Sequence, residues 1–145
     1  IRVGYVAAAP HLLEELARLK MISGLTSSEL TERLAYSALI DGRWRKHLKT
    51  LKERLAKGQQ HLSHVLLGLG FELFTEPKAG MFLWARHPSV SNSAELAYRA
   101  AEQDILLGPG HLFSVDLEPS PWLRFNVAWG QDVALLHFLS AIKAP

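Results

Sequence analysis

Residues 71–85 read Phe-Glu-Leu-Phe-Thr-Glu-Pro-Lys-Ala-Gly-Met-Phe-Leu-Trp-Ala, and at this stretch the hydrophobic pattern of the chain changes. Before it, apolar residues recur every three or four positions. Within it, two apolar runs flank the turn residues Pro77 to Gly80. Because short apolar runs around a Pro-Gly turn are typical of strands, the stretch predicts two adjacent strands at 71–75 and 81–85.

The preceding segment, residues 43–69, predicts the longest helix of the chain. Its leucines follow helical spacing, and its lysines fall on the opposite side. The basic run 43–57 therefore favours a solvated helix surface over a nucleic-acid patch. Gly58 would leave a coiled-coil seam without a side chain to pack, so a helix that bridges two domains fits better than a coiled coil.

The residues after the two strands continue the alternation of helices and strands. Asn92, with Glu95 three positions later, predicts a helix from Ser93 to about Asp104. Short strands are expected at 105–107 and 122–128, and a closing helix at 131–142. The turn Gly108-Pro109-Gly110 follows the first of these strands. Together these elements predict a small α/β layer, and hence an α/β fold class.

The residues before the long helix are less regular. Residues 1–9 predict a strand that is already in progress, so we expect the chain to be a piece of a longer protein. Pro10 opens a short helix to about Met21. The run from Thr26 to Glu29 has the pattern of a capping box, and the helix it opens should carry Leu30, Leu34 and Ala38 inward.

The composition excludes several classes of function. Of the 145 residues 48% are hydrophobic and 21% are charged, as in globular proteins, and a net charge of +2 is too small to indicate a nucleic-acid partner. The absence of cysteine excludes disulfides and thiolate chemistry. No apolar run has the length of a membrane span, which predicts a soluble, cytoplasmic protein. His61 and His64 have no carboxylate within one turn, so no metal site is predicted.

Two arginines stand inside otherwise apolar strands, Arg2 in Ile-Arg-Val-Gly and Arg124 in Leu-Arg-Phe. A guanidinium among apolar neighbours must be paired or face solvent, because an unpaired buried charge is costly. One interpretation is a structural salt bridge or an edge-strand position. The other is a bound anion, since the planar fork of arginine binds carboxylate or phosphate through two bonds.

Several motifs occur in an order and spacing that point to one family, over essentially the whole chain. They are Arg2-Val-Gly-Tyr5, Thr26-Ser-Ser28, the helix from Arg43, Ala79-Gly-Met-Phe-Leu-Trp84, Leu107-Gly-Pro-Gly-His-Leu-Phe113 and Leu123-Arg-Phe-Asn126. The chain resembles the class I/II, fold type I aminotransferases that depend on pyridoxal phosphate, and within them most closely the MocR branch of GntR-family transcriptional regulators. The resemblance implies the end of the cofactor-binding large domain at 1–42, a connecting helix at 43–70 and a small α/β domain at 71–145.

The resemblance also implies roles for residues. Arg2 matches the arginine that holds the phosphate of pyridoxal 5'-phosphate, and Arg124 matches the arginine that binds the substrate α-carboxylate. In the family the Schiff-base lysine lies before the position of Arg2, so this chain should be inactive alone. Gly108 to Gly110 could be a substrate-side loop or an ordinary turn, and the loop at Thr26 either reaches a neighbouring subunit or only caps a helix. Phe82 and Trp84 are expected in the core.

Three functions remain open from the sequence. In a MocR-type regulator the chain would belong to an effector domain that binds an amino acid or amino compound, with DNA bound only through an absent amino-terminal domain. In a catalytic aminotransferase it would act on an amino acid, of the aromatic or α-aminoadipate type for example. Both imply a homodimer that uses pyridoxal phosphate. A structural or interaction module is the third, if Arg2 and Arg124 are salt-bridged.

Overall fold

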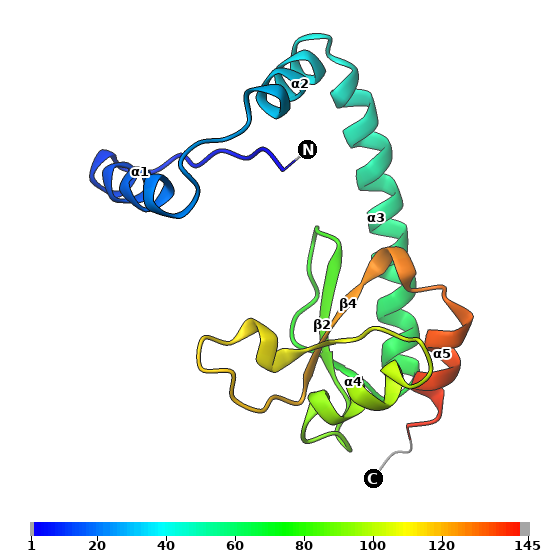
Figure 1. Ribbon diagram of the computed structural model, residues 1–145. Helices are drawn as coiled ribbons and strands as arrows, with labels where there is room; N and C mark the ends of the chain where they lie inside the picture. Colours follow the sequence, from blue (N-terminus) through cyan, green and yellow to red (C-terminus); the bar gives the residue numbers. More distant parts are fainter. Residues whose placement is uncertain (1, 143–145) are drawn as a thin grey trace. The chain divides into compact units, whose positions relative to one another are not determined.

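The computed structural model describes residues 2–142, and the chain divides into two compact units, Ile1–Lys49 and Thr50–Pro145. We call them the amino-terminal unit and the carboxy-terminal unit. Figure 1 traces the elements of each along the chain. No helix within residues 2–142 combines the length and apolar composition that crossing a bilayer requires.

The amino-terminal unit contains helices α1 (Pro10–Gly24) and α2 (Glu29–Ile40) and the start of α3 (Arg43–Gly68). The strand predicted at 1–9 is wrong for residues 2–9, which form no strand and are exposed; Ile1 lies outside the described residues. A strand is stabilised by pairing its backbone with a neighbour, and none of the described residues pairs with this segment.

The first turn of α2 differs from the predicted capping box. Ser28 is the N-cap, yet its side chain makes no capping hydrogen bond; instead the hydroxyl of Thr31 donates to the Ser28 carbonyl oxygen at 2.8 Å. The inward orientation predicted for Leu30 and Leu34 is also wrong, because their exposed fractions are 68% and 51%. Neither α1 nor α2 contains a buried residue. The amino-terminal unit therefore has no hydrophobic core among its described residues.

The carboxy-terminal unit contains a four-stranded antiparallel sheet in the order β1-β2-β4-β3. The pair of strands predicted around residue 77 is confirmed, although the first is only two residues long. The strand predicted at 105–107 lies later, at 108–109, where it pairs with β4. The strands are β1 (Glu72–Leu73), β2 (Phe82–Arg86), β3 (Gly108–Pro109) and β4 (Trp122–Asn126).

One face of this sheet forms the core together with three helices. Side chains alternate between buried and accessible along β2 and β4, as expected where one face of a strand pair is covered. The covering helices are the second half of α3, α4 (Ser93–Ala101) and α5 (Val133–Ser140), grouped around the sheet in Figure 1. The largest fully buried apolar side chains are Leu62, Leu66, Leu83, Leu123 and Leu139.

The ends of the helices explain how the chain turns into this core. The amide of Phe71 donates to the carbonyl oxygen of Leu66, and Gly70, with φ +84°, takes the left-handed conformation that ends α3. At the start of α4, the Asn92 side chain accepts from the amide of Ala94, which confirms the predicted cap. The long helix predicted at 43–69 is confirmed as α3.

Candidate anion-binding site

The outer face of the sheet carries two rows of cationic and aromatic side chains. Across the β2–β4 pair, Arg86 lies opposite Trp122, and Trp84 lies opposite Arg124. Each row thus joins one arginine to one tryptophan. The environments of the two arginines differ, and the difference decides which of them is available to a ligand.

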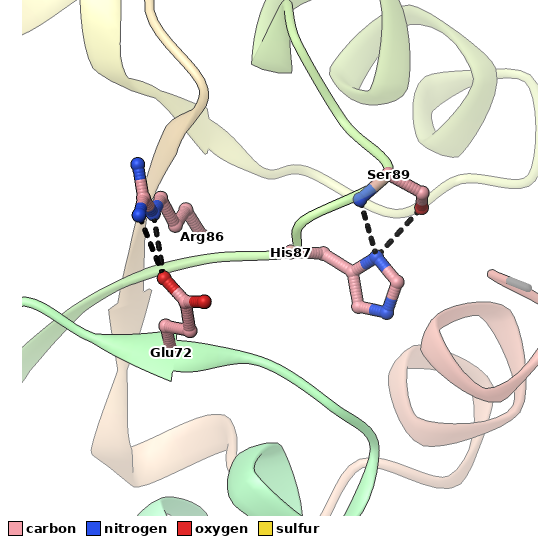
Figure 2. Close-up of polar contacts among 4 residues, drawn as sticks. All are labelled: Glu72, Arg86, His87 and Ser89. Atoms are coloured by element: carbon pink, nitrogen blue, oxygen red, sulfur yellow. Dashed lines mark hydrogen bonds and ion pairs between the residues drawn. The ribbon is translucent and has the colours of Figure 1, made fainter. Parts of the chain in front are cut away.

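Arg86 is held within the protein. Its Nε and Nη2 atoms both lie 2.8 Å from Oε2 of Glu72, as Figure 2 shows. Its Cζ atom lies 5.2 Å from the ring centroid of Trp122. The Trp122 ring also packs edge-on against Phe74. The guanidinium therefore has a carboxylate partner from β1, and we assign Arg86 a structural role.

Arg124 has no such partner. It makes no ion pair or hydrogen bond with its side chain to any residue in 2–142. Its Cζ atom instead lies 4.3 Å from the ring centroid of Phe82 and 4.2 Å from that of Phe113. Both distances are well inside the range of cation–π attraction. The positive charge is thus supported by aromatic rings while its hydrogen-bond donors stay free.

A cavity of about 310 Å³ has Arg124 among the residues of its wall. Its wall is apolar on the side of Leu106 and Leu135, and polar at Arg124 and Asn126. A small cavity lined by both apolar side chains and a few polar groups can hold a small ligand. Because the fork of arginine matches two oxygens of one anion, the arrangement can bind a carboxylate. The lining residues are Phe82, Leu106, Leu107, Gly108, Arg124, Phe125, Asn126, Trp129 and Leu135.

The Gly108–Gly110 turn brings Phe113 to this site. Gly108 lies opposite Arg124 in the β3–β4 pair, and a Cβ atom there would lie 3.2 Å from the Arg124 carbonyl oxygen and 3.7 Å from the Phe113 ring. A Cβ at Gly110 would meet the side chain of Ser120 and, at 2.8 Å, the carbonyl oxygen of Trp122. Gly110 is therefore needed for the close approach of the short helix η1 (Gly110–Phe113), while a side chain at Gly108 would make a tight contact with β4.

The turn is held by hydrogen bonds to Ser93, the first residue of α4. Ser93 is fully buried, and its hydroxyl accepts a hydrogen bond of 3.1 Å from the amide of Gly110. Its own amide donates to the carbonyl oxygen of Ser120 at 2.8 Å. These bonds tie α4 to both ends of the loop that carries Phe113, which makes the loop part of the site's framework.

The predicted core positions of Phe82 and Trp84 are wrong. Both were expected in the core, but they lie on the outer face of the sheet with Arg124, and Phe82 is 40% exposed. Phe113 was not singled out from the sequence as a site residue. The signal for Phe82 was available, since it lies an even number of residues from Trp84 and so shares its face. Phe113 reaches Arg124 through a turn that no periodicity predicts.

Arg2 belongs to the amino-terminal unit, whereas Arg124 belongs to the carboxy-terminal unit. Arg2 is exposed, has a φ of 58°, and makes no ion pair with any described residue. The third function, a structural or interaction module, was tied to salt bridges at Arg2 and Arg124. Neither arginine makes one within residues 2–142. The phosphate role of Arg2 stays a prediction.

His87 is a buried group that the sequence analysis passed over. It is 2% exposed, and its Nδ1 lies 2.6 Å from the hydroxyl of Ser89 and accepts from the Ser89 amide; Figure 2 shows both contacts. Its ring packs edge-on against Phe71. It does not line the cavity beside Arg124. Within residues 2–142 no group of three histidine, aspartate or glutamate side chains is arranged to hold a metal.

Comparison with known proteins decides the family. The sequence profile of the family described as aminotransferase class I and II matches residues 1–142. The chain belongs to this family. Its solved neighbours include the α-aminoadipate aminotransferase LysN of Thermus thermophilus, with a TM-score of 0.71, 24% identity and coverage of 92% of this chain and 35% of that one. The fold is thus that of the carboxy-terminal part of a fold type I aminotransferase.

The relatives by sequence include both regulators and enzymes. The chain is 32% identical over 133 residues, or 88% of its length, to the uncharacterized HTH-type transcriptional regulator YdcR of Escherichia coli. It is 31% identical over 99% of its length to the histidinol-phosphate aminotransferase of Acetobacter pasteurianus. The chain spans 28% of the first relative and 37% of the second. Its match to the aminotransferase-like domain of MocR-type regulators agrees with the resemblance stated above.

Proposed function

We propose that this chain is part of the effector domain of a MocR-type transcriptional regulator, and that Arg124 binds the α-carboxylate of an amino acid or amino-compound effector. The observation that carries the proposal is the free fork of Arg124 beside a cavity, with no carboxylate partner among residues 2–142. Arg124 is exposed, so solvent can hydrate its charge in the described chain; its place in the wall of the cavity and the fork geometry of the guanidinium support an anionic ligand there.

Pyridoxal 5'-phosphate is the cofactor we propose for the full-length protein. When bound, it supplies the reactive carbonyl that captures the amino group of the ligand. The donor chemistry fits, since Arg2 is an unpaired arginine in the described chain and a phosphate is a preferred partner of the guanidinium fork. Arg2 would hold the phosphate, while Arg124 would orient the ligand through its carboxylate.

The remaining parts of the proposal concern the whole protein. We propose a homodimer in the cytoplasm whose DNA contacts come from an amino-terminal winged-helix domain outside this chain. The regulator relative, 32% identical to this chain, is named as HTH-type, which supports the DNA-binding part of this proposal. The domain division we propose is the end of the large domain at 1–42, the connecting helix at 43–70 and the small domain at 71–145.

The test compares two arginines of the same sheet face in the full-length protein. Replacing Arg124 by alanine should raise the amino-acid concentration needed for the change in cofactor absorbance by about 10- to 150-fold, the range of a lost charged hydrogen bond. The cofactor should stay bound. Replacing Arg86 by alanine should leave that required concentration unchanged, because Arg86 is paired with Glu72. If the Arg124 variant responds at the same amino-acid concentrations as the unaltered protein, the carboxylate role is refuted.

The second candidate is a catalytic aminotransferase that acts on an amino acid. It is favoured by the 31% identity to a histidinol-phosphate aminotransferase over nearly the whole chain. In that case Arg124 would bind an anionic group of the substrate, which is the α-carboxylate in an amino acid and the phosphate in the substrate that this relative is named for. Sequencing the full reading frame separates the two candidates: a winged-helix domain ahead of the aminotransferase-like part supports the regulator, and a short amino-terminal arm supports the enzyme.

A further inference from the structure

A second cavity of the carboxy-terminal unit shares part of its wall with the cavity of Arg124. It has a volume of about 580 Å³, and Leu106, Trp129 and Leu135 line both cavities. Because the same apolar side chains border both, a ligand that packs against them can extend from one cavity into the other. The other residues in the wall of the second cavity are Gln103, Asp104, Ile105, Asp132 and Ala134.

The two cavities differ in the sign of their charged groups. Among the described residues, the wall of the first contains the charged side chain of Arg124, and the wall of the second contains those of Asp104 and Asp132. Neither aspartate forms an ion pair within residues 2–142. Arg99, the cation closest to Asp104 in sequence, does not line the cavity. The second cavity therefore offers negative charge to a ligand.

Both carboxylates keep oxygen atoms available for a cation. Asp132 is the N-cap of α5, where its Oδ1 accepts from the amide of Leu135 at 2.9 Å and its Oδ2 has no partner among the described residues. Asp104 follows the last turn of α4, and its side chain makes no hydrogen bond within residues 2–142. The carboxyl end of a helix carries partial negative charge, so the end of α4 also favours a cation there.

The wall that the two cavities share suits an aliphatic chain. Leu106 and Trp129 are 93% and 65% exposed, so a chain that packs against them removes apolar surface from water. The face of the Trp129 ring can also attract a cation. The combined lining therefore matches a ligand with an anionic group at one end, an aliphatic stem, and an ammonium or guanidinium group at the other end.

We infer that Asp104 and Asp132 form a cation subsite, and that the ligand of this protein is an amino acid with a cationic side chain, of the lysine or arginine class. This inference rests on the proposed function of Arg124, which holds the anionic group of the ligand. It adds two residues to the site. It also adds a chemical criterion for the ligand, namely a second positive charge besides the α-amino group.

The test compares two ligands that share an unbranched four-carbon side chain, which ends in an ammonium group in lysine and has no charge in norleucine. Each is used as its reduced conjugate with pyridoxal phosphate through the α-amino group. Calorimetry measures the affinity of each conjugate for the full-length protein freed of cofactor. The variants are Asp104→Asn, Asp132→Asn and Arg124→Ala. Asp116→Asn is the matched control, since Asp116 is exposed and lines neither cavity.

We expect the unaltered protein to bind the lysine conjugate at least about 4-fold more tightly than the norleucine conjugate, since two carboxylates contribute. Each asparagine substitution should lower this preference by about 2- to 5-fold, the range of an ion pair in contact with water. The affinity for the norleucine conjugate should stay within about 2-fold, because that ligand has no charge at the subsite. Asp116→Asn should leave the preference unchanged.

The outcomes separate this inference from the proposed function. If the unaltered protein does not prefer the lysine conjugate, or if neither asparagine variant lowers the preference more than Asp116→Asn does, the cation subsite is overturned. The proposed function still stands in that case if Arg124→Ala weakens both conjugates. An asparagine variant that weakens both conjugates equally counts against the subsite. If Arg124→Ala changes neither affinity, the proposed function is overturned, whatever the aspartate variants show.

Discussion

Gly58 in the middle of α3 lies directly against the backbone of Val127. A Cβ atom at Gly58 would stand 2.9 Å from the Val127 carbonyl oxygen, closer than such contacts occur in proteins. The sequence alone suggested only that Gly58 weakens a coiled-coil seam. In the fold, the missing side chain lets the segment just after β4 approach α3, and Gly130 does the same against Leu62, where a Cβ would lie at 2.9 Å.

Gly58→Ala should destabilise the protein although alanine is the better helix former. Forcing a methyl group against a backbone carbonyl costs about 1–3 kcal/mol, which exceeds the gain of about 1 kcal/mol in helix propensity. Gly68→Ala in the same helix is the control, because nothing lies within 4 Å of its Cβ, and it should be neutral or stabilising. Urea unfolding measures the free energy of unfolding of both variants. Equal effects of the two substitutions would contradict the close contact at Gly58.

Ser93→Ala should remove a buried hydrogen-bond acceptor. Ser93 is fully buried, and its hydroxyl accepts the amide of Gly110 at 3.1 Å. Leaving that amide unsatisfied should lower the free energy of unfolding by about 1–3 kcal/mol. Ser140→Ala, at an exposed hydroxyl that bonds within its own helix, should stay within about 0.5 kcal/mol. A Ser93 variant as stable as the Ser140 variant would show that the amide finds another partner.

The ion pair between Glu72 and Arg86 should contribute little to stability. Both side chains are about half exposed, at 52% and 45%, so solvent and salt screen the pair. A double-mutant cycle with Glu72→Gln and Arg86→Gln should give a coupling of about 0.2–1 kcal/mol. The coupling should decrease in 1 M salt, where the screening length is about 3 Å. A coupling that is larger and independent of salt would mean that the pair is shielded from water.

Amide exchange should divide the 145-residue chain along its two units. Helices α1 and α2 contain no buried residue, whereas α4 and α5 each bury residues in the core. Because helix stability in proteins comes mainly from packing, amides of α1 and α2 should exchange at least about 100-fold faster than those of α4. Mass spectrometry of peptic fragments measures this. Uniform protection across both units would contradict the absence of a core in the amino-terminal unit.

Much of the carboxy-terminal unit was predictable from the sequence. The spacing of leucines predicts α3, and the Asn92 cap predicts α4, because both signals are local. Arg124 was also identifiable, since a charge within an apolar strand needs a partner or solvent. Residues 2–9 have the composition of a strand but form none, because strand formation depends on a pairing neighbour that local sequence does not reveal.

The aromatic surroundings of Arg124 could not be predicted in the same way. Their positions depend on the register that sets Trp84 opposite Arg124 and on the glycine-dependent turn that carries Phe113 to the sheet. Both are properties of tertiary structure. Apolar residues such as Phe82 are usually buried, and composition alone therefore assigns them to the core. Only the strand register shows that they share a face with the arginine.

The shortness of β1 and β3 bears on how the chain behaves at high concentration. Each outer strand of the sheet is two residues long, and β3 ends in Pro109, which has no amide hydrogen to donate. Neither border presents a row of free backbone groups on which a strand of another molecule could build. Among the described residues, leucines along both α1 and α2 are exposed, so self-association of the isolated chain should begin at these helices and should not propagate as a growing sheet.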